Sequence, residues 1–401
     1  MPPDLESVYD RLYSYCERQD FAGHDPFDGL NSRLFQATPL KHLRAARLAW
    51  LQMVKRSPAD VRTLLKVPGG VNAKGIALFT LAELSRLRAT GETLHAENAG
   101  ALADRLLEAR IVGRTPDGRD TAAFGYNFDW QSRSFYAPQG MPAIVPTAFA
   151  CGAFLEAFEA FRDERYIKTA NEICLFILYQ LNRPAWIEDE ICFSYTPNDN
   201  GVVYNASLLA GEVLARVGQI TGNDEYKTKA VKAARFVLNR QRDDGAWVYG
   251  EAPTQRWVDN FHTGYILVSL YRIARAVPQL EVETSDAVAN GIGYWLDNFF
   301  LDDGTPKYYD NAIYPIDIHS AAVAIATMSE LHLRDEDLLP MARKVATWSI
   351  DNMLDPAGFF YYQLRKDRAI KTPFMRWGQA WMAYALARLM EISAISEMRP
   401  K

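Results

Sequence analysis

Hydrophobic residues in the last two thirds of the chain form two alternating kinds of segment. Five segments are apolar on nearly every side, and the four segments between them are apolar along one face only. A helix that is apolar all round is buried all round, whereas a one-sided helix covers a core. The pattern predicts buried helices over 143–161, 202–220, 259–276, 317–332 and 375–392, and amphipathic helices over 164–181, 225–241, 283–299 and 338–353.

The buried segments repeat at a nearly constant interval. The apolar segment 75–89 also matches these segments, with Ala73 in the register position, so six buried helices are expected. The longer spacing of 74 residues from Ala73 to Thr147 is explained by a long aromatic segment between them. A fixed interval of this size is typical of stacked supersecondary units. Aligning the first turns of the other five places Thr147, Asn205, His262, His319 and Gln379 in register, with separations of 58, 57, 57 and 60 residues.

Two further helices, over 40–56 and 98–109, bring the outer set to six, and residues 5–18 also have helical spacing. Six helices buried between an outer layer and a narrow core make an all-α (α/α)6 toroid, and residues 1–401 are expected to form it as a single domain. The N-terminal outer helix is expected to close the ring against the last buried helix. Short aromatic β-hairpins precede the buried helices and are expected at the rim of the ring.

Composition narrows the class of partner. Aromatic residues make up 12% of the chain, with 20 Tyr, 20 Phe and 9 Trp, which is more than packing demands. Sugar-binding clefts use such rings as stacking platforms, although helix packing also uses large side chains. The formal net charge of -5 argues against a nucleic-acid partner.

Cysteine usage and the chain's start bear on location and metals. Cys16, Cys151, Cys174 and Cys192 show neither metal-ligand spacing nor a paired framework, so reduced thiols, no metal and no cofactor are expected. No basic-then-apolar leader pattern opens the chain, and no apolar run reaches the roughly 18 residues of a membrane span. A cytoplasmic protein without a membrane span is therefore expected.

Candidate chemistry gathers at the starts of the buried helices. Inner helices of a toroid run in one direction, so their N-termini converge on one mouth, where helix dipoles favour oxygen-rich or anionic ligands. Asp259 precedes His262 by three residues and Asp317 precedes His319 by two. Each aspartate is either an N-cap or an acid–base partner of its histidine. The other two polar register residues, predicted to bind substrate, are Asn205 and Gln379.

Aromatic and cationic residues surround the same predicted mouth. Rings there are expected to stack on sugars or to pack hairpins against one another. Two arginines that each precede a tryptophan suit recognition of carboxylate or phosphate. The candidate substrate-binding residues are Tyr195, Arg256, Trp257, Tyr265, Tyr309, Arg376 and Trp377, together with Asp129 and Arg133 in the long polar-aromatic segment 111–142. Asp129, Trp130 and Arg133 of this segment are expected to approach the mouth.

Several stretches resemble one protein family. They read GHDPFDGLNS, CFSYTPND, GAWVYGEAPTQRWVDNFHTGY and DGTPKYYDNAIYPIDIHSAA and span most of the chain. They resemble proteins of bacterial polysaccharide-biosynthesis gene clusters that have a six-hairpin glycosidase-like toroid. The resemblance implies that fold and a glycan context. Gln241, Gly245 and Trp247 also match the QxxxGxW repeat of terpene cyclases, but the DxDD acid motif of those enzymes does not occur.

Three functions remain open. The leading prediction is carboxylate-based hydrolysis of an acidic or exopolysaccharide-related oligosaccharide, with Asp259 and Asp317 as the pair and Glu251, Asp199 and Asp129 in reserve. The first alternative is a sugar epimerase or lyase that uses His262 and His319 as its acid–base pair. The second is a non-catalytic glycan-binding or polysaccharide-assembly scaffold. The sugar, the linkage and the oligomeric state stay open.

Overall fold

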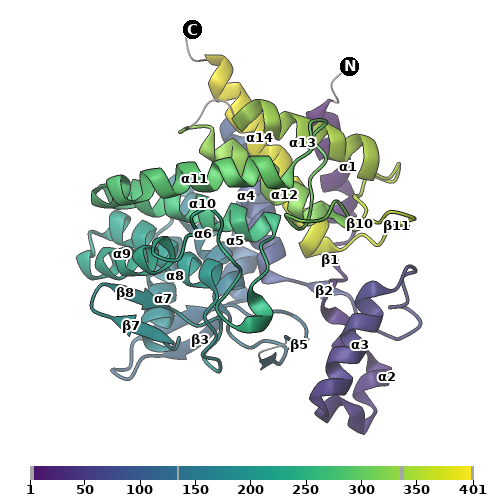
Figure 1. The fold of residues 1–401 in the computed structure, drawn as a ribbon, viewed down its shortest axis with the longest axis horizontal. Helices are drawn as coiled ribbons and strands as arrows, with labels where there is room; N and C mark the ends of the chain where they lie inside the picture. Colours follow the sequence, from purple (N-terminus) through teal and green to yellow (C-terminus); the bar gives the residue numbers. More distant parts are fainter. Residues whose placement is uncertain (1–3, 133–134, 335–337, 399–401) are drawn as a thin grey trace.

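A computed structural model describes residues 4–132, 135–334 and 338–398. Within this part of the chain, six helices form an inner ring. Each inner helix contacts the next in sequence, and the last contacts the first, so the ring is closed (Figure 1). The inner helices are α4 (Ala73–Thr90), α6 (Ile144–Phe161), α8 (Tyr204–Thr221), α10 (Asn260–Ala276), α12 (Ile318–Leu331) and α14 (Ala380–Met398).

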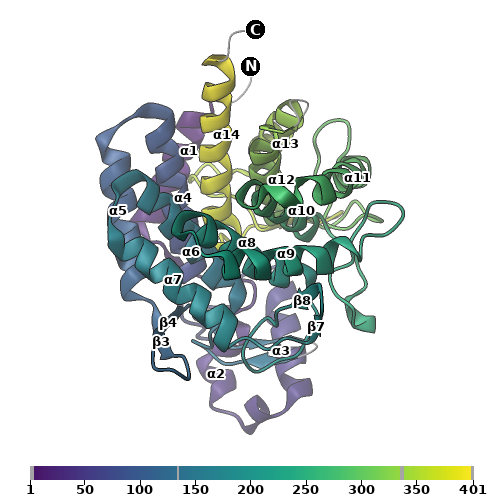
Figure 2. The ribbon, with the colours of Figure 1, turned by 90° about the vertical axis from the view of Figure 1, so that its left-hand side faces the viewer.

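A second layer surrounds this ring. Each outer helix packs on an inner neighbour, and Figure 2 shows most of the layer lying around the inner helices. The prediction of an all-α (α/α)6 toroid is confirmed. The outer helices are α5 (Thr93–Glu108), α7 (Glu164–Tyr179), α9 (Asp224–Leu238), α11 (Glu281–Phe299), α13 (Leu338–Met353) and α1 (Leu5–Arg18), which packs on α14.

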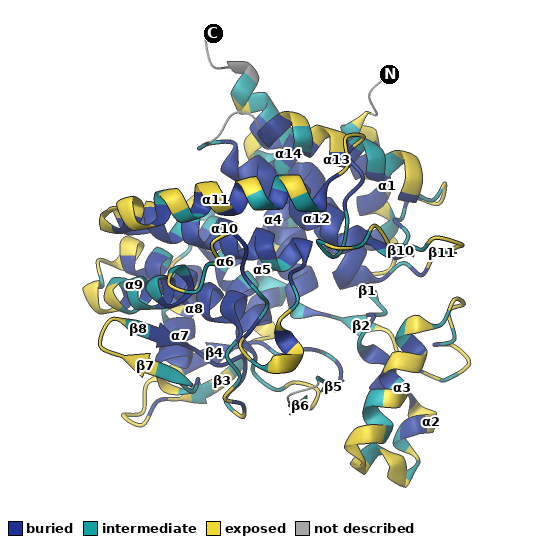
Figure 3. Ribbon diagram, in the orientation of Figure 1, coloured by how far each residue is buried: buried dark blue, intermediate teal, exposed yellow. Residues whose placement is uncertain are grey.

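Local sequence explains where the inner helices begin and end. The side chains of Asn72, Asp259 and Asp317 accept hydrogen bonds from backbone N–H groups in the first turns of α4, α10 and α12. Gly91 and Gly222 end α4 and α8 in the left-handed conformation that glycine adopts without strain. Every residue of α12 is buried, and Figure 3 shows the inner layer dark and the outer layer exposed on one side.

One helix assignment is wrong. The predicted outer helix over 40–56 is α3 (Arg44–Arg56), which stands off the ring with α2 (Arg33–Gln36) and the short turns η1 (Asp28–Asn31) and η2 (Pro39–His42) (Figure 1). Only Leu51 and Val54 of α3 are buried, which is too narrow a face to cover the core. The sixth outer helix is α1, whose buried residues are Val8, Tyr9, Leu12, Tyr13 and Cys16.

Short antiparallel strand pairs lie between the helices, as predicted for the rim. They are β1 (Ala22–Gly23) with β2 (Gly70–Val71), β3 (Ile111–Arg114) with β4 (Asp120–Ala123), β5 (Trp130–Gln131) with β6 (Tyr136–Ala137), β7 (Ala185–Ile187) with β8 (Glu190–Cys192), and β10 (Gln363–Leu364) between β9 (Ile316–Asp317) and β11 (Ala369–Ile370).

Side chains on the inner helices tie the segments that precede them to the ring. In three repeats a side-chain oxygen accepts a hydrogen bond from the backbone N–H of a buried phenylalanine. This explains why polar residues occupy these inner-helix positions without facing a ligand. The pairs are Phe124 N with Thr147 Oγ1 at 2.9 Å, Phe193 N with Ser207 Oγ at 3.1 Å, and Phe360 N with Gln379 Oε1 at 2.8 Å.

The QxxxGxW match is a structural turn. Gln241 Nε2 donates to the carbonyls of Gly245 at 2.9 Å and Ala287 at 2.8 Å, and Trp247 Nε1 donates to the carbonyl of Val237 at 2.9 Å. Gly245 has a φ of 91°, and a Cβ there would lie 2.5 Å from the carbonyl oxygen of Asn290. The motif therefore fastens α9 to α11.

Replacing Gly245 by Ala is expected to lower the free energy of unfolding by about 2–3 kcal/mol, because the backbone strain adds to the clash. Urea denaturation measures the change. The matched control is Gly293→Ala within α11, where a Cβ meets nothing within 4 Å and the substitution is expected to stabilise by about 0.5–1 kcal/mol. Equal effects at the two positions would contradict this account of the turn.

Eight charged side chains, four Arg and four Glu, join the inner helices at the end of the toroid opposite the mouth. Arg and Glu alternate along this series of ion pairs, which passes through all six inner helices and returns to the first. We call this set the charge ring. Its contacts are Arg88–Glu156 at 3.1 Å, Glu156–Arg216 at 4.0 Å, Arg216–Glu212 at 3.6 Å, Glu212–Arg272 at 3.0 Å, Arg272–Glu330 at 3.4 Å, Glu330–Arg388 at 2.7 Å, Arg388–Glu391 at 2.7 Å and Glu391–Arg88 at 2.7 Å.

Two bulk features bear on the expected environment. All four cysteine side chains are buried and free of disulfides, in line with the expected reduced thiols. By length and composition, α6 is long and apolar enough to cross a membrane, but 61% of its 18-residue span is buried inside the structure. A core helix of a toroid meets the same criterion.

Candidate functional site

A cavity of about 620 Å³ opens at the N-terminal ends of the inner helices. Five consecutive inner helices each place their second residue on its wall. The sixth position is filled from a π-helical turn, η5 (Met375–Gln379), that leads into α14. The wall residues from these helix starts are Lys74, Val145, Asn205, Phe261 and His319, with Arg376 and Trp377 from the π-helical turn.

The register in the structure differs from the predicted one. Ala73 and Thr147 were expected at the mouth, but Lys74 and Val145 line the cavity instead. Lys74 is the main functional candidate that the sequence comparison missed. Its signal was a charged residue in the first turn of a helix whose first half is otherwise uncharged, and Lys74 is 2% exposed.

Asp259 and His262 form a dyad on the cavity wall. One carboxylate oxygen of Asp259 caps α10 by accepting from the backbone N–H of His262 at 2.9 Å, and the other lies 2.6 Å from His262 Nδ1. That second oxygen also accepts from Trp257 Nε1 at 2.9 Å. Asp259 therefore holds the proton on Nδ1 and turns Nε2 outward, and no described residue hydrogen-bonds Nε2.

Aromatic rings contact the imidazole of His262. Tyr249 stacks on Trp257, with ring centroids 4.8 Å apart, and lies 4.5 Å from the His262 ring. Phe261 lies 4.1 Å from the same ring. The imidazole is thus held in one orientation by packing as well as by hydrogen bonds, and its side chain is still 19% exposed.

His319 belongs to a different hydrogen-bond chain. Its Nδ1 lies 2.9 Å from the carbonyl oxygen of Trp377 and its Nε2 lies 3.0 Å from the hydroxyl of Tyr265. Because a carbonyl only accepts, Nδ1 carries the proton and Nε2 accepts from Tyr265. Lys74 Nζ is 3.3 Å from the same hydroxyl. The chain runs from Lys74 through Tyr265 to His319.

Burial sets the protonation of this chain. Desolvation, reinforced by Lys74, lowers the pKa of His319 well below its usual value, so the imidazole is neutral. Burial raises the pKa of Tyr265 well above the ordinary value, so the phenol keeps its proton. Burial and the nearby Arg376 together lower the pKa of Lys74 well below the ordinary value.

Asp317 does not reach the cavity. Its side chain is fully buried, and its two oxygens accept from the His319 backbone N–H at 2.9 Å, from Trp377 Nε1 at 2.9 Å and from Gln363 Nε2 at 2.6 Å. Burial raises its pKa to about 6. Asp317 caps α12 and fixes Trp377, which stacks on His319 with centroids 3.9 Å apart. The predicted pairing of Asp259 with Asp317 across a substrate is therefore not present.

Arg376 is held in place by the motif GHDPFDG. Arg376 Nε is 2.6 Å from a carboxylate oxygen of Asp25, and Asp28 is 2.8 Å from Arg62 Nε. Arg62 also donates to the carbonyl of Asp25 at 2.9 Å. These buried pairs anchor the N-terminal loop to the π-helical turn. The motif therefore positions Arg376 at the cavity and also contributes one wall residue of its own, Phe27.

The remaining predicted site residues divide into two groups. Asn205, Tyr195 and Tyr309 line the cavity, and Asn205 Oδ1 is buried without a hydrogen-bond partner among the described residues. Gln379, Arg256 and Asp129 do not line it, so the prediction that Gln379 opens onto the cavity is wrong. Gln379 binds Phe360, Arg256 is exposed, and Asp129 accepts from Gln139 N and Gln36 Nε2. Arg133 lies outside the described residues.

The long segment 111–142 contributes aromatic wall residues, as expected for a segment that approaches the mouth. Sequence reasoning named only Trp130 among these. Tyr126 hydrogen-bonds the hydroxyl of Tyr195 at 2.7 Å. The wall residues from this segment are Tyr126, Phe128, Trp130, Ser132 and Phe135.

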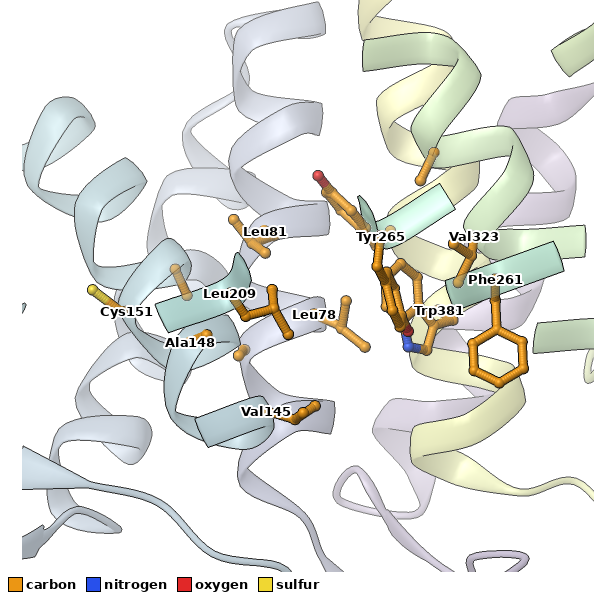
Figure 4. Packing of buried hydrophobic residues seen from close by; sticks show 14 of the residues in the cluster. Leu78, Leu81, Val145, Ala148, Cys151, Leu209, Phe261, Tyr265, Val323 and Trp381 are labelled. Atoms are coloured by element: carbon orange, nitrogen blue, oxygen red, sulfur yellow. The ribbon is translucent and has the colours of Figure 1, made fainter. Parts of the chain in front are cut away.

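Figure 4 shows buried side chains from different inner helices packing against one another inside the ring. Tyr265 and Trp381 lie beside each other, with ring centroids 5.6 Å apart, and Leu78, Leu209 and Val145 approach from other inner helices. Among the described residues, no group of three His, Cys, Asp or Glu side chains is placed to hold a metal ion.

No protein-family model matches the sequence, and no curated protein matches it significantly. Solved structures do match. A cellobiose 2-epimerase from Bacillus thermoamylovorans B4167 has a TM-score of 0.61 at 12% identity, over 81% of this chain and 88% of that one. A sugar epimerase from a ruminal bacterium has a TM-score of 0.58 at 14% identity, over 82% and 89%. An unsaturated glucuronyl hydrolase specific for heparin has a TM-score of 0.59 at 13% identity, over 81% and 87%.

Identities this low establish the fold alone, because epimerases, lyases, hydrolases and an isomerase are all among the similar structures. The chain therefore has the (α/α)6 toroid fold that these structures share.

Proposed function

We propose that this protein is a carbohydrate-active enzyme that moves a proton at a sugar carbon, as an epimerase, isomerase or lyase does. The observation that carries the proposal is His262, whose Nε2 faces the cavity while Asp259 holds Nδ1. Among the described residues, Asp259 is the one carboxylate that lines the cavity. Hydrolysis by two flanking carboxylates lacks its second member there.

The proposed roles follow from the hydrogen bonds. His262 Nε2 takes a proton from a carbon next to the carbonyl of an open-chain reducing sugar. The C–H electron pair moves into an enediolate, whose oxygen charge is stabilised by donors on the cavity wall. Asp259 stabilises the imidazolium that forms and keeps its orientation.

Return of the proton needs a second group. The Tyr265 hydroxyl faces the cavity with His319 and Lys74 bonded behind it. In an epimerisation it delivers a proton to the same carbon from the other face, and in an isomerisation the neighbouring carbon receives the proton. His319 then acts through Tyr265 rather than on the substrate directly, which modifies the alternative with His262 and His319 as the acid–base pair.

The wall of the cavity suits a sugar. Trp257, Trp377 and Tyr195 offer ring faces and edges for stacking, and Asn205 offers an unpaired amide oxygen to a hydroxyl. Proteins named as cellobiose 2-epimerase and D-mannose isomerase are among the structures that share the fold. They support the proposal only as examples of this chemistry on a toroid.

The test is incubation with a panel of reducing mono- and oligosaccharides in heavy water. We expect deuterium on the carbon next to the carbonyl, together with an isomeric sugar and no shorter product. Release of new reducing ends without carbon-bound deuterium would make the protein a hydrolase. Binding without either product would favour the scaffold.

Three broader statements belong to the same proposal. Residues 1–401 act as one domain, in the cytoplasm, on glycans of polysaccharide biosynthesis. The resemblance of the motifs supports the last of these. Cell fractionation with an antibody against the protein tests the location, and a single calorimetric unfolding transition tests the domain organisation.

A further inference from the structure

A second groove, of about 410 Å³, lies next to the cavity. The two spaces share a wall that includes Lys55 and Arg56 of α3 and the adjacent rings of Tyr308 and Tyr309. Beyond the rings the groove runs along Tyr314 and Pro315 to Arg365 on the loop between β10 and β11. The groove therefore lies directly beside the cavity, across the side chains that line both spaces.

The groove is cationic. Its charged wall residues are Lys55, Arg56 and Arg365, and no described acidic residue lines it. Arg365 Nε is buried without a hydrogen-bond partner among the described residues. A buried guanidinium N–H without an acceptor costs free energy that a bound anion recovers.

Lys55, which also lines the groove, likewise indicates a bound anion. Its Nζ lies 4.0 Å from the centre of the Phe27 ring, and no ion pair joins it to an acidic side chain in the described ranges. Burial lowers the pKa of Lys55 to about 8, against the opposing effect of Asp317 and Asp25. An anion beside Nζ would offset that cost of burial.

The position of α3 outside the ring places its C-terminal residues at the cavity and the groove. The helix does not cover the core, but its last turn brings Gln52, Lys55 and Arg56 over the mouth. The small cluster of Leu30, Phe35 and Leu51 fixes the helix in that place. Figure 1 shows α3 standing apart from the outer layer of helices.

We propose that the groove is a second sugar subsite that binds an anionic unit, carrying a carboxylate or sulfate, of an oligosaccharide whose reacting sugar lies in the cavity. The inference rests on the proposed function, since it takes the cavity to hold a sugar. Tyr308 and Tyr309 separate the two subsites and offer ring faces to the linkage between the units.

The test compares tetrasaccharides of equal length by titration calorimetry. The acidic probes are tetragalacturonate and a heparin-derived tetrasaccharide, the neutral probe is cellotetraose, and UDP-glucuronate represents an anion that belongs to a nucleotide. We expect at least one acidic tetrasaccharide to bind roughly tenfold or more tightly than cellotetraose, with an affinity that falls as salt rises. Tighter binding of UDP-glucuronate than of both acidic tetrasaccharides would overturn the oligosaccharide assignment.

The double variant Arg56→Gln/Arg365→Gln is expected to lose that preference, whereas Lys168→Gln, an exposed lysine of α7, keeps it. Wild-type affinity in the double variant, or no preference for either acidic probe in the wild type, would overturn the subsite. Failure of the proposed reaction is separate, because His262→Ala is expected to keep the binding preference. An arginine-dependent preference without any deuterium labelling would leave the subsite standing and reject the reaction.

Discussion

Replacing Arg388 by Met is expected to lower the free energy of unfolding by about 3–5 kcal/mol. Arg388 joins Glu330 at 2.7 Å and Glu391 at 2.7 Å, and the side chain is 13% exposed. Its removal leaves two buried carboxylates short of a cation and opens the charge ring at the junction of α12, α14 and α4. Urea denaturation of the variant measures the loss.

The matched control is an ion pair on the surface. Arg235 binds both oxygens of Glu283 at 2.8 Å, but the two side chains are 36% and 42% exposed. Arg235→Met is expected to change the free energy of unfolding by less than about 1 kcal/mol. If both variants lost the same amount, the closed arrangement of the buried charges would contribute nothing beyond ordinary pairing.

The charge ring also predicts the response to acid. Against the raising effect of burial, Arg388 and Arg272 hold the pKa of Glu330 well below its usual range, and Arg88 and Arg388 lower that of Glu391. A carboxyl whose pKa is depressed on folding stabilises the protein above its unfolded pKa of about 4.3, and this stabilisation is lost as the pH falls further.

The pKa of Asp317 is shifted in the opposite direction, so its effect on stability has the opposite dependence on pH. Its pKa is raised to about 6, so its ionisation costs stability above that pH, and the cost disappears as the pH falls from about 6 to 4. Unfolding temperatures measured from pH 7 to 3 are expected to fall steeply only below about pH 4. Arg388→Met is expected to show a shallower fall there, because Glu330 and Glu391 have lost a partner. Parallel curves for the two proteins would contradict this explanation.

Replacing His262 by Ala is expected to reduce turnover by about 10²–10⁴-fold, the usual contribution of a general base. The side chain is 19% exposed and partly open to the cavity, so the unfolding temperature is expected to change little. Asp259→Asn is expected to reduce turnover as well, since the amide no longer stabilises the imidazolium. The control is His42→Ala, at an exposed residue of η2.

The two aspartate–histidine pairs show what a sequence pattern resolves and what it does not. Both aspartates cap an inner helix, as expected. Asp259 lies three residues before His262, and side chains three apart on a helix are neighbours, so the carboxylate meets the imidazole. Asp317 lies two residues before His319, which turns the imidazole to another side, towards Tyr265 and the carbonyl of Trp377. The one-residue difference in spacing therefore decides whether the capping aspartate also bonds the imidazole of its histidine.

The repeat predicted the ring but not each position on its wall. Thr147 and Gln379 each lie two residues beyond a wall residue, Val145 and Trp377 respectively. At that position the side chain bonds the backbone of the preceding segment instead of facing the cavity. Lys74 was missed because the alignment was anchored on Ala73, one position away. The sequence predicted helices at both α1 and α3. Only the wider buried face of α1 shows that it, and not α3, closes the ring.

The most direct test of the proposed site is solvent exchange into a confirmed substrate, compared between the wild type and His262→Ala. In heavy water the wild type is expected to place deuterium on the carbon next to the sugar carbonyl, and His262→Ala is expected to lose that exchange while the protein stays folded. Equal exchange rates in the two proteins would show that another group removes the proton and would contradict the assignment of His262 as the base.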